Sequence, residues 1–234
     1  MNVIAHPTTV DLSRVTLREL HIELHSLAPD TNRTAWRLIH PRGSHSVAVG
    51  LNAPIAVTVD GHVGYYAAGM NALASVFING NAGPGVAENM MSGEVRVAGD
   101  ASMAAGASGC GGLLVIEGNA GARCGISMKG IDIVVRGSVG HMSAFMAQEG
   151  NLVVCGDAGD ALGDSLYEAR IFVRGAVKSL GADCEEKPMG ATDRAILEDL
   201  LARARIDDNT ASEFRRFGSA RRLYHFHVDH AGSY

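Results

Sequence analysis

The sequence predicts an all-β fold, a parallel β-helix of seven nineteen-residue coils with short helical caps at both ends. The first observation behind this prediction is a glycine that recurs at every nineteenth position through the middle of the chain. The second is that each of these glycines ends a short run rich in β-branched residues, which favour strands. The third is composition: 29 glycines and only 5% aromatic residues are typical of a chain that turns often and packs small side chains.

The seven strand candidates share one pattern of apolar and polar positions. The residues four and two places before the glycine are always aliphatic, as are Leu114 and Ile116 before Gly118. The residue directly before it is mostly polar, as is Glu117, so one face of each strand is predicted to face the core. We expect each glycine to form a corner, where the backbone needs a positive φ or a close approach to the neighbouring coil. The predicted corner glycines are Gly61, Gly80, Gly99, Gly118, Gly137, Gly156 and Gly175. The β-helix of hexapeptide acyltransferases would need eighteen residues per coil, which this interval does not fit.

Residues 1–46 carry no repeat and are predicted to form an N-terminal extension and cap. Thr16 followed three residues later by Glu19 is a candidate capping box that opens a short helix, and Pro29 closes this segment. Leucines at helical spacing give that helix an apolar face. They are Leu17, Leu20, Leu24 and Leu27.

The glycine-rich β-helix is predicted to occupy residues 47–185, and residues 186–234 are assigned to a C-terminal helix and tail. Thr192 or Asp193 can cap this second helix at its N-terminus. Its apolar stripe comprises Ile196, Leu197, Leu200 and Leu201. Because the open ends of a solenoid expose unpaired strand edges, we expect both flanking segments to act as caps.

The tail is basic and aromatic, and arginine and aromatic residues are enriched where proteins contact one another. The candidate interface residues are Arg215, Arg216, Arg221, Arg222, Tyr224 and Phe226. A cap that folds back on its own rod is an equally good interpretation of the same residues. A third alternative, metal binding, rests on His225, His227 and His230, which alternate along the chain.

Charge and composition exclude several function classes. A net charge of −5 with a pI near 6 is not the basic footprint of a nucleic-acid-binding protein and gives no attraction to anionic membranes. The first thirty residues carry charges and no apolar run of signal-peptide length, so we expect a cytoplasmic protein. The cysteines form no Cys-x-x-Cys pair and are expected to be free thiols. They are Cys110, Cys124, Cys155 and Cys184.

The predicted rod offers little evidence of a catalytic site. A nucleophile elbow, a P-loop and a zinc-protease signature are absent from the sequence. Acidic residues along the coils leave open a carbohydrate-active β-helix, although stacking aromatics are few. These acids are Glu88, Glu94, Glu117, Asp157, Asp160 and Asp164. Residues 47–165 carry only fourteen charged side chains, and a weakly charged surface of this kind favours a permanent subunit interface.

The run of coils with G-x-x-G corners, FINGNAGPGVAENMMSGEVRVAGDASMAAGASGCGGLLVIEGNAGARCGISMKG, resembles the glycine-rich C-terminal domain of the large subunit of glutamate synthase. The resemblance covers residues 47 to about 185 and implies a right-handed parallel β-helix. With its short N-terminal extension and its RRFGSARRLYHF segment, the chain is more specifically similar to the small β-helical subunit of N-methylglutamate synthase, also called methylamine–glutamate N-methyltransferase.

This resemblance implies two partners, a class II glutamine-amidotransferase-like subunit and a flavin-bearing glutamate-synthase-like subunit. The FMN and the iron–sulfur cluster of the family belong to the flavin-bearing partner, and the present chain offers no positions that match the catalytic cysteine or the cofactor ligands. We therefore assign no catalytic, cofactor-binding or metal-binding residue to it. The β-helical subunit of formylmethanofuran dehydrogenase, or of the related formyltransferase/hydrolase complex, is similar to the same domain and remains an alternative.

Overall fold

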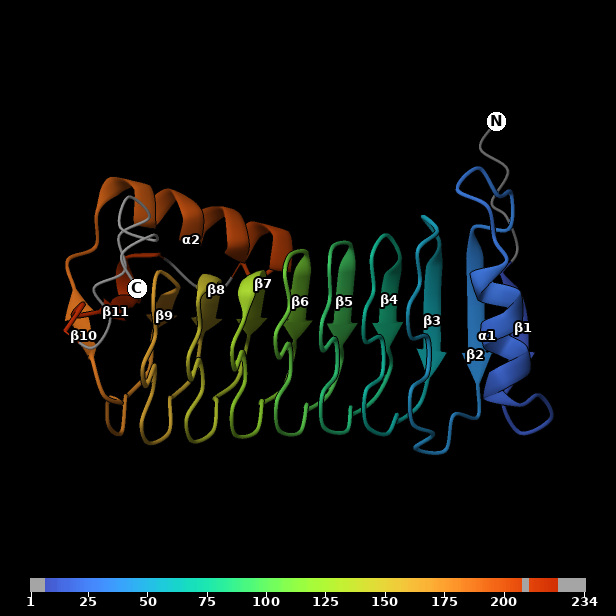
Figure 1. Cartoon of the computed structure of the whole chain (residues 1–234), viewed down its shortest axis with the longest axis horizontal. Coiled ribbons are helices and arrows are strands. Elements are labelled where there is room, and N and C mark those ends of the chain that lie inside the picture. Colours follow the sequence, from blue (N-terminus) through green and yellow to red (C-terminus); the bar gives the residue numbers. More distant parts are fainter. Residues whose placement is uncertain (1–6, 208–210, 223–234) are drawn as a thin grey trace, which may run out of the picture.

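The computed structural model of the protein describes residues 7–207 and 211–222. It is a rod built on one eleven-stranded sheet, with two α-helices at its periphery (Figure 1). The sheet order is β1 to β9 in sequence, followed by β11 and then β10. The strands are β1 (Thr8–Asp11), β2 (Ala35–Ile39), β3 (Ala56–Asp60), β4 (Ser75–Ile78), β5 (Glu94–Val97), β6 (Leu113–Ile116), β7 (Lys129–Val135), β8 (Glu149–Val154), β9 (Arg170–Val173), β10 (Cys184–Lys187) and β11 (Arg215–Ser219). The helices are α1 (Leu17–His25), α2 (Ala191–Ala204) and a 3-10 turn at Ala211–Glu213.

Strands β3 to β9 pair in parallel in one register, which confirms the predicted solenoid. Val57 lies opposite Val76, which lies opposite Val95, and the same step continues to Ile171. The aliphatic residues predicted to face inward are all buried, Ile116 among them with no exposed surface. The nineteen-residue repeat therefore places every core side chain on its equivalent in the next coil.

The parallel sheet extends beyond the predicted coils at the N-terminal end. Strand β2 pairs with β3, and β1 pairs with β2, both in parallel. Trp36 and Leu38 occupy the inward positions opposite Val57 and Val59, and both are buried. The intervals between paired residues of these strands are longer than nineteen residues, so the nineteen-residue period does not reveal β1 and β2.

Opposite the strands, each coil returns through consecutive turns in which alternate residues are left-handed. In the first complete coil these are Tyr66, Ala68 and Met70, with φ of 62°, 52° and 55°. The amide of Ala68 donates to Val47 O in the preceding coil, whereas that of Met70 donates to Glu88 O in the following one. The middle one of the three left-handed positions in each coil is buried. It always holds glycine or alanine, because a larger side chain there would project into the filled core. These residues are Ala68, Ala87, Gly106, Gly125, Ala144 and Gly163.

Glycine is required at the predicted corners mainly because adjacent coils approach closely there. A Cβ atom on Gly80 would lie 2.7 Å from the carbonyl carbon of Gly61. One on Gly118 would lie 2.8 Å from Gly99 O. Of the seven corner glycines only Gly61 has a positive φ, +135°. Close approach is thus the more general of the two reasons considered from the sequence.

The residues that follow the first six corner glycines form a polar ladder along the rod, which ends at the backbone N–H of Ala176. Asn81 Oδ1 accepts the backbone N–H of Asp100 at 3.0 Å, and Asp100 Oδ1 accepts that of Asn119 at 2.7 Å. In the next coil towards the C-terminus, Asn119 Oδ1 accepts the backbone N–H of Ser138 at 2.9 Å. His62 begins it through Nδ1, which accepts the N–H of Asn81 at 2.9 Å. Side-chain acceptors therefore replace the strand hydrogen bonds that end at the corner.

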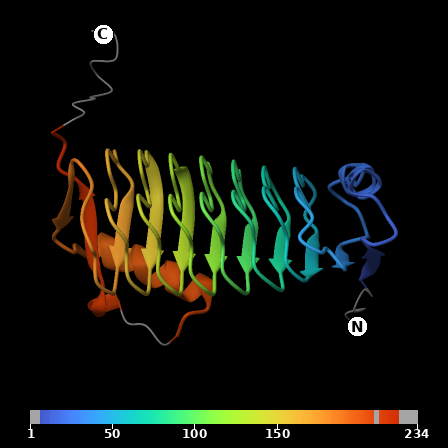
Figure 2. The ribbon, with the colours of Figure 1, turned by 90° about the horizontal axis from the view of Figure 1, so that it is seen from below.

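The N-terminal helix is confirmed as a cap. Thr16 and Glu19 form the predicted capping box, and Leu20 and Leu24 are buried against the end of the core. Leu17 and Leu27 are partly buried and pack on the same cluster. Seen along its own axis in Figure 2, α1 lies across the end of the rod.

The C-terminal helix is not an end cap, which corrects the expectation from the sequence. Strand β11 pairs antiparallel with β9 and with β10, and β11 and β10 form the C-terminal end of the sheet. Helix α2 instead runs along the flank of the rod, across the strands (Figures 1 and 2). It packs there on an apolar surface formed by outward-facing strand residues. No helix in the described ranges is long and apolar enough to cross a bilayer.

Alanine substitution of a corner glycine tests the close approach of the coils. We expect Gly118→Ala to lower the free energy of unfolding by about 2 kcal/mol, since the new methyl group must displace backbone of the preceding coil. Gly218→Ala is the matched control, because the nearest atom to its new Cβ, Lys187 Cγ, is 3.5 Å away. Chemical denaturation of both variants measures the difference. Equal destabilisation would contradict the close-approach explanation.

Candidate functional site

The outward face of the parallel sheet is divided into a covered half and an open half. Its central column, one residue per strand from β3 to β9, reads Thr58, Phe77, Arg96, Val115, Val134, Val153 and Phe172. The last four of these residues are apolar and fully buried although they face away from the solenoid core. They form a second core with Leu197, Leu200, Leu201 and Ala204 of α2, joined by Ile206 and Phe214.

This second core corrects the expectation that each strand has a single buried face. Four successive units carry an apolar residue at the outward position, and α2 carries the complementary stripe. Packing the two apolar surfaces together stabilises the fold by about 25 cal/mol for each Å² of apolar area removed from water. This gain places the helix on the flank rather than over the end.

The open half-face consists of the outward residues of β3 and β4 with Glu94 of β5, which α2 does not cover. Phe77 at its centre leaves 38% of its surface exposed. Ala56 and Ser75 are exposed and Thr58 is partly exposed. A large aromatic side chain on a flat strand surface is typical of a contact site for another molecule.

Arg96 marks the boundary between the two halves. Its side chain is 7% exposed, and the guanidinium donates from Nη1 to Ala204 O at 2.9 Å and from Nη2 to Arg203 O at 2.6 Å. Its Nε donates to Glu94 Oε1 at 2.5 Å, and Glu117 Oε1 lies 3.5 Å from Nη1. A cation at the C-terminus of a helix satisfies the last carbonyl groups and complements the helix dipole. Arg96 therefore fixes where α2 ends on the sheet.

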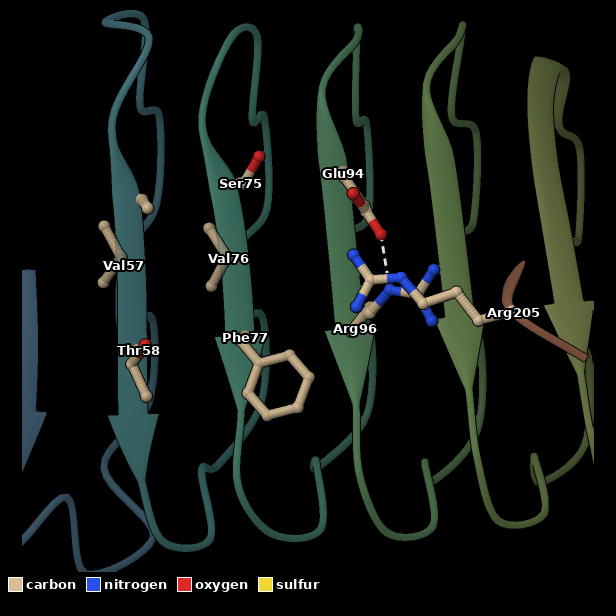
Figure 3. Close-up of a pocket in the computed structure, with 9 residues that line it drawn as sticks. Val57, Thr58, Ser75, Val76, Phe77, Glu94, Arg96 and Arg205 are labelled. Atoms are coloured by element: carbon tan, nitrogen blue, oxygen red, sulfur yellow. Dashed lines mark hydrogen bonds and ion pairs between the residues drawn. The ribbon is translucent and has the colours of Figure 1, made fainter. Parts of the chain in front are cut away.

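A hollow of about 220 Å³ lies on the open half-face beside Arg96 (Figure 3). Arg205, the left-handed C-cap of α2 with φ of 61°, extends its side chain into it towards Arg96. Within the described part of the chain, the Arg205 guanidinium and the hydroxyl groups of Ser75 and Thr58 have no hydrogen-bond or ion-pair partner. The hollow is lined by Ala56, Val57, Thr58, Ser75, Val76, Phe77, Glu94, Arg96 and Arg205.

Comparison with known proteins gives one relative of nearly full length. Protein GlxC of Rhizobium meliloti (strain 1021) is 60% identical over 225 residues, which is 96% of this chain and 99% of that protein. The chain belongs to the GlxC family. No family model matches the sequence. The match spans nearly the whole of both chains.

The acidic residues that suggested a carbohydrate-active protein do not form one groove in this GlxC-family chain. Glu94 and Glu117 meet only as partners of Arg96. Asp157 belongs to the corner ladder, where its Oδ1 accepts Ala176 N–H at 2.7 Å. Asp160 pairs with Lys178 at 2.8 Å, and hydrogen bonding by that ammonium lowers the pKa of the carboxyl group. Glu88 lies on the wall of turns, and Asp164 accepts Ala182 N–H at 3.1 Å.

Two of the four thiols of the GlxC-family chain, Cys124 and Cys184, have raised pKa values and are therefore not activated nucleophiles. Burial raises the pKa of Cys124 to about 12. Burial, aided by the neighbouring carboxylates, raises that of Cys184 to the same value. Cys155 is buried under α2, and Cys110 is exposed at the edge of the coils. Among the described residues no group of three or more His, Cys, Asp or Glu side chains is placed to hold a metal ion. His225, His227 and His230 lie outside the described residues.

The basic tail is tied to its own rod as far as the structure describes it. Arg215 donates to Gly175 O at 3.0 Å, and Arg216 lies 3.2 Å from Asp193. Nη2 of Arg221 lies 2.7 Å from both carboxylate oxygens of Glu168, and the backbone N–H of Arg222 donates to Asp183 at 2.8 Å. These contacts favour the interpretation of residues 215–222 as a cap. Tyr224 and Phe226 of the candidate interface lie outside the described residues.

Removal of Arg96 tests its role as the anchor of α2. We expect Arg96→Ala to lower the free energy of unfolding by about 2 kcal/mol, because it leaves Glu94 and the helix C-terminal carbonyls without their partner. Arg96→Lys should recover part of this loss, since it restores the charge without the planar fork. Arg123→Ala, which removes an exposed arginine on the other wall, should change stability by less than about 0.5 kcal/mol. Denaturant titration followed by circular dichroism compares the three. A loss for Arg96→Ala no larger than that for Arg123→Ala would remove the anchor role.

Proposed function

We propose that this GlxC-family chain is a scaffold subunit of a glutamate-synthase-like enzyme complex. The resemblance of residues 47–185 to the glycine-rich domain of glutamate synthase supports this proposal, and so does the solenoid itself. The observation that carries it is the division of the sheet face. The chain covers one half with its own helix and leaves the other half open, flat and bearing Phe77.

The chemistry of the described residues is consistent with support rather than catalysis. The interior is filled by aliphatic side chains, and the buried thiols have raised pKa values. The acids near the hollow are committed to Arg96 and are therefore not free to act on a substrate there. Catalytic groups would therefore come from other subunits.

In its finer form, the proposal is that the complex is N-methylglutamate synthase and makes N-methylglutamate from glutamate and methylamine. Its other subunits would be a class II glutamine-amidotransferase-like chain and a flavin-bearing glutamate-synthase-like chain in the cytoplasm. FMN and the iron–sulfur cluster would belong to the flavin-bearing chain. The closing RRFGSARRLYHF segment supports this choice over other glutamate-synthase-like complexes.

Purification of the native complex tests the proposed function. The full-length chain, carrying an affinity tag, should co-purify in fixed stoichiometry with the amidotransferase-like and flavin-bearing chains, identified by mass spectrometry. The complex should show flavin absorbance and form N-methylglutamate from glutamate and methylamine. The isolated chain should do neither.

Three results separate the levels of the proposal. A chain that purifies alone, or that turns over substrate by itself, would contradict the scaffold function. A complex with both partners but a different product would overturn only N-methylglutamate as the product. Co-purification with formylmethanofuran dehydrogenase subunits would replace the glutamate-synthase-like assignment with the alternative.

A further inference from the structure

We propose that the hollow on the open half-face binds a carboxylate side chain, aspartate or glutamate, of a partner subunit, with Arg205 as the principal cation. This inference rests on the proposed function, because it names the chemistry by which the scaffold would recognise its partner. It concerns the side chains around the hollow and not the basic tail.

Charge pairing on this face leaves Arg205 as the available cation. Arg37 pairs with Asp60 at 2.5 Å, and Arg136 lies 3.5 Å from Glu117. Arg96 is committed to Glu94 and to the end of α2. Among the described residues Arg205 has no such partner although it is exposed and faces the hollow. Because Glu94 balances the charge of Arg96, the unpaired positive charge at the hollow is that of Arg205, and it favours the approach of an anion over that of a cation.

The donors in the hollow match the acceptors of a carboxylate. Arginine offers a planar fork that binds both carboxylate oxygens at once, so the Arg205 guanidinium alone can hold the carboxylate at this end of the hollow. The backbone of Arg205 is fixed as the left-handed cap of α2, with an N–H that donates to Leu201 O and Ala202 O. The cation is thus attached to a rigid element rather than to a loop tip.

The size and surroundings of the hollow favour a side chain of a protein over a free small carboxylate. A volume of about 220 Å³, open to solvent, encloses one acidic side chain but cannot bury a free ligand on all sides. Phe77 beside it supplies apolar area that only a larger surface can cover, and aromatic residues next to arginine are typical of interface anchors. The flat strands of the open half-face would accept such a surface.

Zero-length cross-linking in the assembled complex tests this directly. In the Arg205→Lys variant, a carbodiimide should join residue 205 to a partner carboxylate. The carbodiimide converts the carboxylate into an O-acylisourea, the lysine amine attacks its acyl carbon to form an amide bond, and the C–O bond to the isourea breaks so that a urea leaves. Arg194→Lys is the matched control, because Arg194 is exposed on the same helix and its guanidinium donates to Met189 O. Mass spectrometry should find a peptide in which residue 205 is joined to a peptide of a partner chain, and no such interchain peptide containing residue 194; a link from residue 205 to Glu94 of its own chain does not count as support.

Affinity measurements extend the test. Arg205→Gln should weaken binding of the partner chains about tenfold, whereas Arg194→Gln should leave it unchanged. If the wild-type complex forms and Arg205→Gln binds equally well, with no cross-link at residue 205, the carboxylate site is wrong while the scaffold function stands. If the wild-type chain binds no partner, the proposed function itself fails. Thermal stabilisation of the isolated chain by sodium glutamate over sodium chloride, lost in Arg205→Gln, would mean that the hollow takes a free carboxylate and would overturn the choice of a protein side chain.

Discussion

Close stacking of equivalent corners is the constraint on which the rest of this rod depends. Parallel strands lie about 4.8 Å apart, and the repeat gives every corner of the coil that same separation from the next. A Cβ atom at Gly156 would lie 2.7 Å from the backbone of Gly137, so side chains are excluded there. The polar residue after a corner glycine then accepts a backbone N–H of the next coil through its side chain, as Asn119 does for Ser138. Glycine followed by a small polar acceptor is thus the local rule that keeps the coils in register.

The same register determines the outer surface of the sheet. Because equivalent residues lie in columns, a change of residue type along one column divides the whole face. Valine and phenylalanine from β6 onward require cover, which α2 provides, and Arg96 of β5 ends that helix by capping its last carbonyls. On the far side of Arg96 the column continues with Phe77 and Thr58, which the chain leaves uncovered. The open half-face is therefore a consequence of sequence periodicity and not an irregularity of the fold.

The strands β3 to β9 and the helix α1 could be predicted from the sequence because their signals are local or strictly periodic. The fixed glycine interval determines the strands, and Thr16 with Glu19 determines where α1 begins. Strands β1 and β2 could not be found in this way, since their partners lie at longer intervals and Trp36 occupies a position that is aliphatic elsewhere. The antiparallel pairing of Arg216 in β11 with Phe172 in β9 is equally non-local.

The candidate site was the least predictable feature. Val115 and Val134 could have indicated a second buried face, because outward strand positions are otherwise polar, but nothing in the sequence places them against α2. The hollow depends on contacts between residues more than a hundred positions apart, such as Arg96 with Ala204. The tail arginines could be predicted as contact residues, yet which surface Arg221 contacts is decided by Glu168 on its own rod.

The central claim is that the open half-face is the surface on which a partner subunit docks. Hydroxyl-radical footprinting of the isolated chain and of the purified complex measures this, because the oxidation rate of a side chain follows its exposure to water. Phe77 is 38% exposed on the open half-face, whereas Tyr65 and Met103 are 52% and 46% exposed on a different side of the coil. The account predicts that oxidation of Phe77 falls in the complex while that of Tyr65 and Met103 stays the same. Protection of Tyr65 and Met103 with Phe77 unchanged would contradict it.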